Sequence, residues 1–320
     1  MTKKERVFAV LAGEKPDQIP VGLWLHFPKY AFYGQQAIKT HLRFFEETDM
    51  DLCKVMNECM YPCNHSIYSA EDWKNVKAYD RNAEFIQKEK RIIEGVLEAL
   101  PDRCVMATIH GVVASASHTL LGISGYDSIG KYAQLYHFRT HRESVLNAYQ
   151  KIAESLCVMV EEFVETGIDG IYYAALGGEC GAFTDEEHER WIAPLDRMVL
   201  DTAYKAGVKF VVLHMCKSGV NLKRFLDYPC DVINWGEEES GINLETGRAM
   251  FGGKVILGGL SNHHGPLING GYKELEHQVH HLIKLHGSEK FIIGSDCTLP
   301  SSTPYERINW VSKATATFGK

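Results

Sequence analysis

The chain has 320 residues, of which 45% are hydrophobic and 23% charged, and its formal net charge at pH 7 is −7. This composition is typical of a soluble globular protein, and the negative charge gives no electrostatic footprint for nucleic acid. No stretch approaches the roughly 18 consecutive apolar residues of a membrane helix, and residues 1–6 lead into an amphipathic segment, not a signal peptide. We therefore expect a cytoplasmic protein without nucleic-acid or membrane partners.

The length fits either two domains or one α/β barrel with a full core, and we favour a single domain over residues 1–320. The nine cysteines are an odd number and lie scattered along the chain, without the density of a disulfide scaffold. We expect reduced thiols, most of them buried.

The first half of the chain alternates strand and helix patterns after a short helix at residues 3–11. Three strands and two helices are predicted there, at residues 19–26, 51–57 and 104–110 and at residues 35–47 and 81–100. Periodicity does not resolve residues 58–79, which we interpret as an insertion between the second and third strands. Residues 128–166 are helical in pattern for longer than a usual helix, which predicts two helices or a bend.

The second half continues the alternation at a spacing typical of βαβ units. The predicted strands are 168–174, 208–216, 230–235, 254–260 and 290–295, and the predicted helices are 185–206, 222–226, 244–251, 272–286 and 304–317. Thr184 and Glu187 have capping-box spacing, which supports a helix start at residue 185. Eight strands alternating with helices predict a (β/α)8 TIM barrel with an N-terminal helical extension, and a doubly wound open sheet is the alternative.

Polar or metal-binding side chains follow every predicted strand. They are His26, Asn57, His110, Glu179, His214, Cys216, Glu237, Asn262, His263 and Cys297. A closed barrel makes the carboxyl ends of its strands converge, whereas an open sheet spreads them along a line, so this pattern favours the barrel. Tyr172, Tyr173 and Trp235 also stand near strand ends, either as an apolar wall against a substrate or as ordinary barrel packing.

The strongest chemical signal is His214-Met215-Cys216 at the end of the fifth strand, with Cys297 just after the eighth. Residues two apart in an extended segment point the same way, so His214 and Cys216 share one side. One imidazole and two thiolates suit zinc and leave its fourth coordination position open. We predict a zinc site at these three residues, and incidental buried thiols are the competing interpretation.

These motifs resemble a known family. The segment His214-Met215-Cys216-Lys217-Ser218-Gly219, with the distant Cys297 in Gly294-Ser295-Asp296-Cys297-Thr298-Leu299-Pro300, is similar to the zinc signature of the zinc-dependent methyltransferases. These are the methylcobalamin:coenzyme M methyltransferases and their relatives in the uroporphyrinogen decarboxylase superfamily. Residues 6–21 and 183–194 also resemble parts of that superfamily, and cobalamin-independent methionine synthase carries the same His-Met-Cys with a distant Cys.

The resemblance implies methyl transfer between a corrinoid and a small thiol. A free thiol with a pKa of about 8.5 is mostly protonated at neutral pH, whereas a thiol bound to zinc is deprotonated. The Asp-x-His-x-x-Gly signature of a built-in corrinoid module is absent from the sequence, so methylcobalamin would arrive free or on a separate corrinoid protein. Glu237 is the first candidate for a resting zinc ligand, with Glu238 and Glu239 as rivals; a solvated acidic loop is the alternative.

One departure bears on the substrate. The arginine-rich segment that binds porphyrinogen carboxylates in the decarboxylases corresponds here to Leu25-His26-Phe27-Pro28-Lys29-Tyr30, which argues against a tetrapyrrole. A metal-free decarboxylase-like lyase and a non-catalytic corrinoid-binding accessory protein remain as alternatives. The candidates for substrate binding are His26, Asn57, His110, Glu179, Trp235, Asn262 and His263. Cys59 and Cys63, near His65, are interpreted as incidental thiols in preference to a second metal site or a redox pair.

Overall fold

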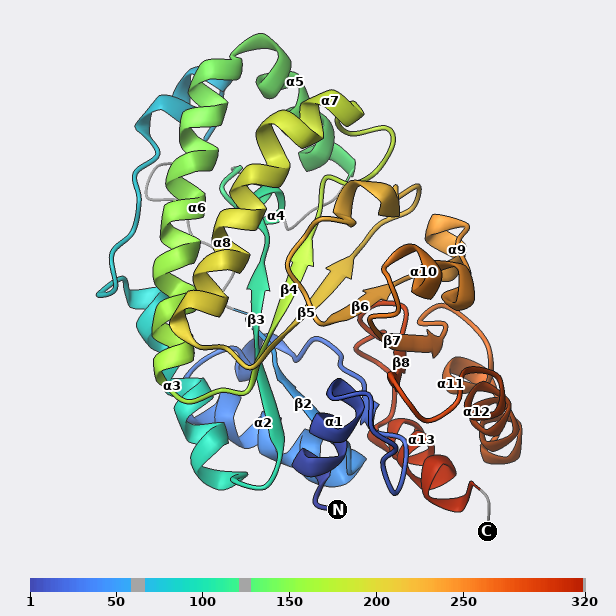
Figure 1. Cartoon of the computed structure of the whole chain (residues 1–320). Coiled ribbons are helices and arrows are strands. Elements are labelled where there is room, and N and C mark those ends of the chain that lie inside the picture. The colour runs from blue at the N-terminus through green and yellow to red at the C-terminus, as the bar shows by residue number, and fades with distance from the viewer. Residues whose placement is uncertain (59–66, 121–127, 319–320) are drawn as a thin grey trace.

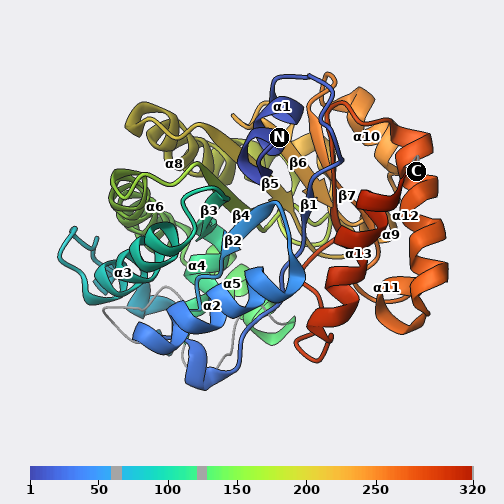
Figure 2. The ribbon, with the colours of Figure 1, turned by 90° about the horizontal axis from the view of Figure 1, so that it is seen from below.

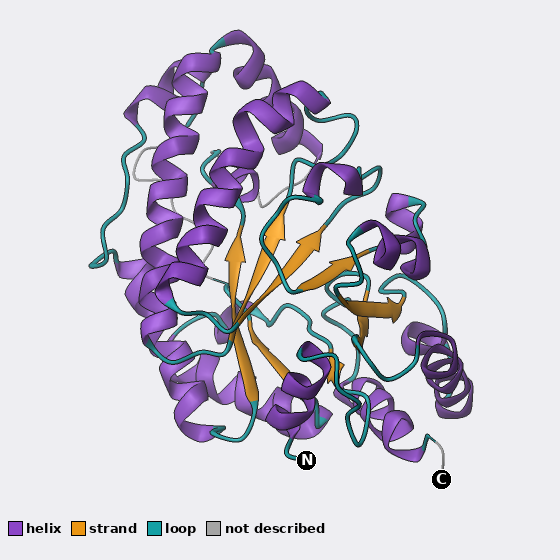
Figure 3. Cartoon of the chain, in the orientation of Figure 1, coloured by secondary structure: helices purple, strands orange, loops and turns teal. Residues whose placement is uncertain are grey.

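A computed structural model describes residues 1–58, 67–120 and 128–318. Eight parallel strands form one sheet in the order β1-β8-β7-β6-β5-β4-β3-β2. The strands are β1 (Val21–Gly22), β2 (Leu52–Val55), β3 (Cys104–His110), β4 (Gly170–Ala175), β5 (Phe210–Met215), β6 (Val232–Trp235), β7 (Val255–Leu260) and β8 (Phe291–Ser295). The two ends of this order also meet, because the Asp51 N–H donates to the Val21 carbonyl at 3.1 Å. The sheet therefore closes into the predicted (β/α)8 TIM barrel and not into a doubly wound sheet (Figure 3).

Helices surround the barrel (Figure 1). The longer ones are α2 (Gly34–Thr48), α3 (Glu84–Ala99), α5 (Ser128–Thr140), α6 (Arg142–Glu165), α8 (Ala193–Ala206), α12 (Tyr272–His286) and α13 (Tyr305–Thr317). The shorter ones are α1 (Lys3–Leu11), η1 (Lys29–Ala31), η2 (Ala70–Asn75), α4 (Val112–His118), α7 (Asp185–Glu187), η3 (His188–Ile192), η4 (Leu222–Phe225), α9 (Glu237–Ser240), α10 (Leu244–Met250) and α11 (Pro266–Asn269). Each long helix buries one apolar stripe; α3, for example, buries Ile86, Ile92, Ile93 and Val96. Among the described helices, none has the length and apolar character of a membrane span.

An aspartate stands directly before each of β2, β4 and β6 and holds the preceding strand at its amino end. Each carboxylate accepts from a valine N–H, in the pairs Asp51 with Val21 at 3.0 Å, Asp169 with Val105 at 3.1 Å and Asp231 with Val211 at 2.9 Å. The N–H of each aspartate donates back to the carbonyl of the same valine. These reciprocal bonds satisfy backbone groups at the barrel rim that the strand ladder leaves unpaired.

Helix α1 lies at the amino ends of the strands, the side from which Figure 2 views the barrel. It begins with a capping box between Thr2 and Glu5. Lys4 Nζ lies 2.8 Å from the buried carboxylate of Asp169, and the Arg6 guanidinium binds Asp51. The N-terminal extension therefore neutralises two of the rim aspartates.

The predicted strands are present, but the first is shorter than residues 19–26. Its ladder ends at Gly22, because the next amide, that of Leu23, donates to Met50 Sδ and not to a strand carbonyl. Leu25 then pairs only as an isolated bridge with Leu299. Short helices α4, α9 and α11 were not predicted.

The long helical stretch divides at His141 into α5 and α6, which confirms the predicted interruption. The predicted helix at 185–206 is also interrupted. It begins with the Thr184 capping box, widens into a π-helical turn over residues 188–192 and continues as α8. Pro194 explains the widening, since its ring has no N–H and crowds the carbonyl one turn earlier. Cys59, Cys63 and His65 lie outside the described residues.

Candidate metal centre

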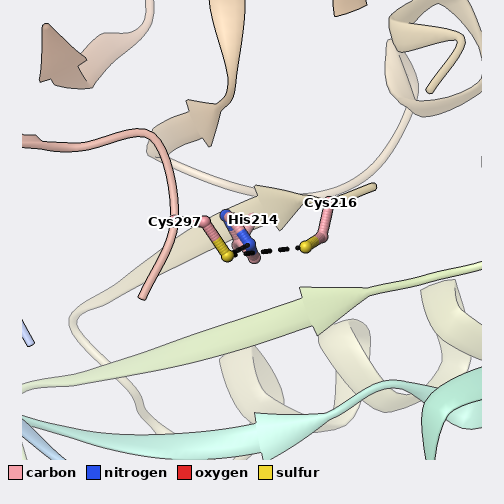
Figure 4. A group of neighbouring side chains, drawn as sticks. All are labelled: His214, Cys216 and Cys297. Atoms are coloured by element: carbon pink, nitrogen blue, oxygen red, sulfur yellow. Dashed lines mark hydrogen bonds between the residues drawn. The ribbon is translucent and has the colours of Figure 1, made fainter. Parts of the chain in front are cut away.

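Three metal-binding side chains converge at the carboxyl ends of the strands. His214 belongs to β5, Cys216 follows it directly, and Cys297 lies two residues beyond β8. Cys297 Sγ is 3.5 Å from Cys216 Sγ and 3.4 Å from His214 Nε2, and Figure 4 shows the three side chains pointing toward one another. In the described part of the chain they form the one group of at least three His, Cys, Asp or Glu ligands whose atoms all lie within 4.8 Å of one another.

The separations suit a tetrahedral zinc ion. Bonds of about 2.3 Å to sulfur and about 2.05 Å to nitrogen place tetrahedral ligand atoms about 3.5–3.8 Å apart. The measured 3.4 and 3.5 Å require only small shifts to reach that geometry. A set of one nitrogen and two sulfur ligands also matches zinc in chemistry and leaves one coordination position free.

Asn234 of β6 orients the His214 ring. His214 and Asn234 are direct partners in the β5/β6 register, and His214 Nδ1 lies 2.6 Å from Asn234 Oδ1. The Asn234 amide nitrogen donates to the carbonyls of Leu257 and Ser295 at 2.8 and 3.0 Å, which identifies Oδ1 as the acceptor facing the histidine. Nδ1 therefore carries the proton, and the lone pair of Nε2 points to the two thiols.

The two thiols are hydrogen-bonded to each other, and this bond shifts their pKa values in opposite directions. The hydrogen bond from Cys216 holds the pKa of Cys297 well below its usual value. The same hydrogen bond, with burial, raises the pKa of Cys216 well above it. Removing both protons requires a cation, because two thiolates at 3.5 Å repel each other in a buried site.

A cavity of about 350 Å³ opens beside the three residues. Its lining contains four histidines, two lysines and two cysteines, but no aspartate, glutamate or arginine among the described residues: His26, Lys54, Met56, Thr108, His110, Ala114, His118, Tyr172, Ala174, Leu176, His214, Cys216, Lys217, Cys297 and Thr298. A volume of this size suits a small molecule. The side chains that face it are neutral or basic.

Two of the seven residues predicted to bind substrate line this cavity. His26 is half-exposed, and its Nδ1 lies 3.0 Å from the buried Glu58 carboxylate. His110 ends β3, and its ring lies 5.2 Å from that of His118, edge to face. Burial and the neighbouring His118 ring lower the pKa of His110 well below its usual value, so this imidazole is neutral at pH 7.

The other five predicted residues do not line this cavity, and each has a polar partner elsewhere. Asn57 and Asn262 donate to the Thr108 and Thr298 carbonyls at 3.3 Å, and Glu179 binds Lys131 at 3.0 Å. Alternation along β6 turns Asn234 into the barrel and Trp235 outward, where its indole donates to the Ile242 carbonyl. His263 is exposed and lies 3.7 Å from Glu239.

The acidic loop after β6 does not join the metal-binding group, contrary to the expectation for Glu237. Helix α9 starts at Glu237, and its carboxylate accepts from the Leu244 N–H at 3.0 Å at the start of α10. Glu238 binds His264 at 2.7 Å. The chain thus turns these carboxylates toward neighbouring loops. Burial, and after it the charges of these glutamates, raises the pKa of Asp296, next to Cys297, to about 7.

The predicted candidates omitted Asn234, Lys54 and His118. The sequence could have indicated Asn234, because it is the one amide in the apolar run Val232–Trp235 and a buried amide in a strand needs hydrogen-bond partners. Lys54 carried a similar signal, as a lysine inside the buried strand Leu52–Val55. His118 lies on α4, which was not predicted, so no pattern placed it near the cavity.

The fold and site define a (β/α)8 barrel with a His-Cys-Cys cluster at the carboxyl ends of its strands. The family model described as uroporphyrinogen decarboxylase (URO-D) matches residues 50–318. The chain belongs to this family.

Solved structures share the fold at low sequence identity. A methyltransferase from Methanosarcina mazei is 16% identical, with a TM-score of 0.78 over 99% of this chain and 98% of that one. A B12-independent methionine synthase from Shewanella sp. W3-18-1, in complex with selenomethionine, is 12% identical, with a TM-score of 0.63 over 93% and 97%. A β-mannanase from the blue mussel Mytilus edulis is also 12% identical, with a TM-score of 0.53 over 95% and 94%. No curated protein matches the sequence. One fold hosts several chemistries, so the site must indicate the function.

Proposed function

We propose that this chain is a zinc-dependent methyltransferase that moves a methyl group between a corrinoid and a small thiol. The observation that carries the proposal is the convergence of His214 Nε2, Cys216 Sγ and Cys297 Sγ beside a small cavity. Membership of the uroporphyrinogen decarboxylase family and the fold shared with the methyltransferase from Methanosarcina mazei support it. We further propose that the corrinoid, such as methylcobalamin, comes free or on a separate partner protein.

The three side chains would hold zinc, and its chemical contribution when bound is to keep a coordinated thiol deprotonated at neutral pH. Asn234 fixes the His214 tautomer that offers a lone pair. The cavity wall beside the cluster is apolar at Tyr172, Ala174 and Leu176, which excludes water from the sulfur of a bound thiol. In the transfer, the thiolate donates an electron pair to the methyl carbon, and the bond between the donor and that carbon breaks.

A metal-free lyase is the second candidate, because the family model bears the name of a decarboxylase. Decarboxylation of a substrate with several carboxylates requires fixed cations around it. The described cavity lining offers two lysines but no arginine to bind carboxylates in a bidentate way, and its volume of about 350 Å³ is small for a tetrapyrrole. These features favour the methyltransferase.

Metal analysis of single variants tests the proposal. We expect about one zinc per chain in the wild type. In Cys216→Ser and in Cys297→Ser we expect loss of zinc, and the rate of thiol-dependent demethylation of methylcobalamin should fall by more than about 100-fold. The measurements are elemental analysis of the purified protein and the absorbance change of methylcobalamin against a panel of thiols. Cys180→Ser is the matched control, because Cys180 is exposed and lies outside the cluster. A wild-type chain without zinc, or a His214→Ala, Cys216→Ser double variant that keeps it, would refute the metal site.

A further inference from the structure

Lys54 of β2 is a buried lysine without a carboxylate partner among the described residues. Arg6 and Lys54 are the only lysine or arginine residues buried in the described part of the chain, and Lys54 is 3% exposed. Arg6 binds both Asp17 and Asp51. For Lys54, no described carboxylate lies within ion-pair distance. An ammonium buried in this way is costly, and such groups are retained where the charge has a use.

The contacts of Lys54 Nζ are weak acceptors. It lies 4.1 Å from the ring centroid of Tyr172 and 4.9 Å from that of Trp24, and it donates to Met56 Sδ at 3.3 Å. Two aromatic faces and a thioether attract a cation but do not neutralise it. Burial lowers the pKa of Lys54 to about 7, so an anion that enters the cavity shifts this side chain toward its charged form.

Tyr172 connects Lys54 to the metal centre. Its ring stacks on the His214 ring, with 5.3 Å between centroids and 24° between planes, and its hydroxyl lies 3.5 Å from Asn234 Oδ1. Lys54 and the three candidate metal ligands line the same cavity. Negative charge on Cys297 and Cys216 raises the pKa of Lys54, against the larger effect of burial. The charge of Glu58 also raises the pKa of Lys54, but the Glu58 carboxylate binds His26 Nδ1 and the Phe27 N–H instead of Lys54.

The charge balance of the centre changes when a thiol binds. Two cysteine thiolates and a neutral imidazole cancel the charge of a divalent ion, and a third thiolate leaves one excess negative charge. The cavity lining contributes no arginine; its second lysine, Lys217, is partly exposed at the mouth of the barrel, and its remaining basic groups are imidazoles such as that of His110. Of the two described lysines in this lining, Lys54 is the buried one, and it is placed to offset that charge from within the barrel.

We propose that Lys54 is the counter-charge for the thiolate sulfur of the substrate, held behind Tyr172 so that its ammonium stabilises the thiolate without contacting it. This inference rests on the proposed zinc and thiol chemistry. It differs from a role in binding an acidic group at the far end of the substrate, and from a purely structural cation–π contact with Tyr172 and Trp24. The three roles predict different results for Lys54→Met.

Thiol binding to cobalt-substituted protein separates these roles, because thiolate coordination to Co2+ gives a visible charge-transfer band. The titrants are 2-mercaptoethanol, with a neutral tail, and 3-mercaptopropionate, with an acidic tail. We expect Lys54→Met to retain cobalt and to bind both thiols at least about tenfold more weakly, since one full charge is lost near the sulfur. Lys54→Arg, which keeps the charge, should recover most of the affinity, and Lys223→Met, an exposed lysine on η4, should match the wild type.

The number of protons released when a thiol binds is a second measurement, and a purely structural role of Lys54 would leave it unchanged by Lys54→Met. A thiol loses its proton on binding, and a Lys54 that serves as the counter-charge should take up part of that proton at pH 8, because burial lowers its pKa to about 7. We expect Lys54→Met to release close to one full proton per thiol, and the wild type clearly less, as measured by calorimetry in buffers of different ionisation enthalpy.

Weakening confined to 3-mercaptopropionate would assign Lys54 to an acidic tail and overturn the inference. Unchanged affinity for both thiols, or equal proton release, would reduce Lys54 to a packing role and overturn it as well. If the wild type binds cobalt but no thiol gives a charge-transfer band, the proposed function itself fails. A normal wild-type response with an unaffected Lys54→Met rejects only the role of Lys54.

Discussion

Asn234 shows how one buried side chain sets the chemistry of another. It stands between Ile233 and Trp235 in an otherwise apolar strand, and its amide makes bonds in three directions. Two of its bonds, to Leu257 and Ser295, tie β6 to β7 and to the end of β8. The third bond fixes the proton of His214 on Nδ1. Replacing Asn234 therefore affects both stability and metal binding, and different substitutions affect the two to different extents.

Two substitutions of Asn234 separate these effects. Asn234→Leu has a similar volume but no acceptor, so we expect zinc affinity to fall about 10- to 100-fold and the free energy of unfolding to fall by about 1–3 kcal/mol. Asn234→Asp keeps an acceptor for His214 but loses the two donors, so its zinc affinity should stay within about tenfold of the wild type while its stability falls at least as much. Competition with a chromophoric chelator and urea unfolding measure the two quantities. Equal zinc affinity in the Leu variant and the wild type would show that the tautomer does not depend on Asn234.

At the scale of elements, Asp196 of α8 joins parts of the chain that are distant in sequence. Its carboxylate accepts from the hydroxyl of Tyr173 on β4, from the hydroxyl of Tyr228 at 3.1 Å and from the N–H of Val112 at the start of α4 at 3.2 Å. Burial raises the pKa of Asp196 from 3.8 to about 6. The packing of α4 and α8 on the barrel thus includes a carboxyl group that titrates in mild acid.

This shift predicts a pH dependence of stability. Since the folded state favours the protonated carboxyl, its contribution to the free energy of unfolding is complete below pH 3.8 and falls as the pH rises through about 6. We expect the free energy of unfolding of the wild type, relative to Asp196→Asn, to decrease by about 2 kcal/mol between pH 4 and pH 7. Urea unfolding across this range measures the difference. Asp201→Asn, an exposed position on the same helix, should follow the wild type at every pH, and parallel curves for the wild type and Asp196→Asn would contradict the assignment.

At the scale of the whole molecule, the barrel is closed at its amino end by ionic contacts to α1. The carboxylate of Asp51 is buried between β1 and β2, where it binds the Val21 N–H and the Arg6 guanidinium. This closure joins the first residues of the chain to a sheet whose last strand, β8, ends at Ser295. We therefore expect the stability of the whole barrel to depend on the short N-terminal helix.

Two arginine substitutions compare a buried with an exposed ion pair. Arg6→Ala leaves Asp51 as an unpaired buried charge, so we expect the free energy of unfolding to fall by about 3 kcal/mol or more. Arg43→Ala removes an exposed pair with Glu47 on α2, so we expect a change of less than about 1 kcal/mol. Urea unfolding at pH 7 measures both. Similar losses in the two variants would show that α1 does not close the barrel.

The sequence by itself determined the strand and helix order, because period-2 and period-3.6 patterns depend on which faces are buried. It also identified His214, Cys216 and Cys297 as metal-binding candidates, because residue chemistry and strand ends are visible in a linear chain. The residues that line the cavity beside the metal centre were harder to predict. Trp235 and Asn262 follow strands just as His26 does, but only His26 lines the cavity.

The tertiary structure decided what depends on register and side-chain direction. Asn234 meets His214 because β5 and β6 pair in one particular alignment, and Lys54 reaches the cavity because it faces into the barrel from β2. A shift of one residue in either strand would turn these side chains to the opposite face. Such contacts join residues 20 to more than 80 positions apart, as in His214 with Asn234 and with Cys297, and only the closed barrel brings them together.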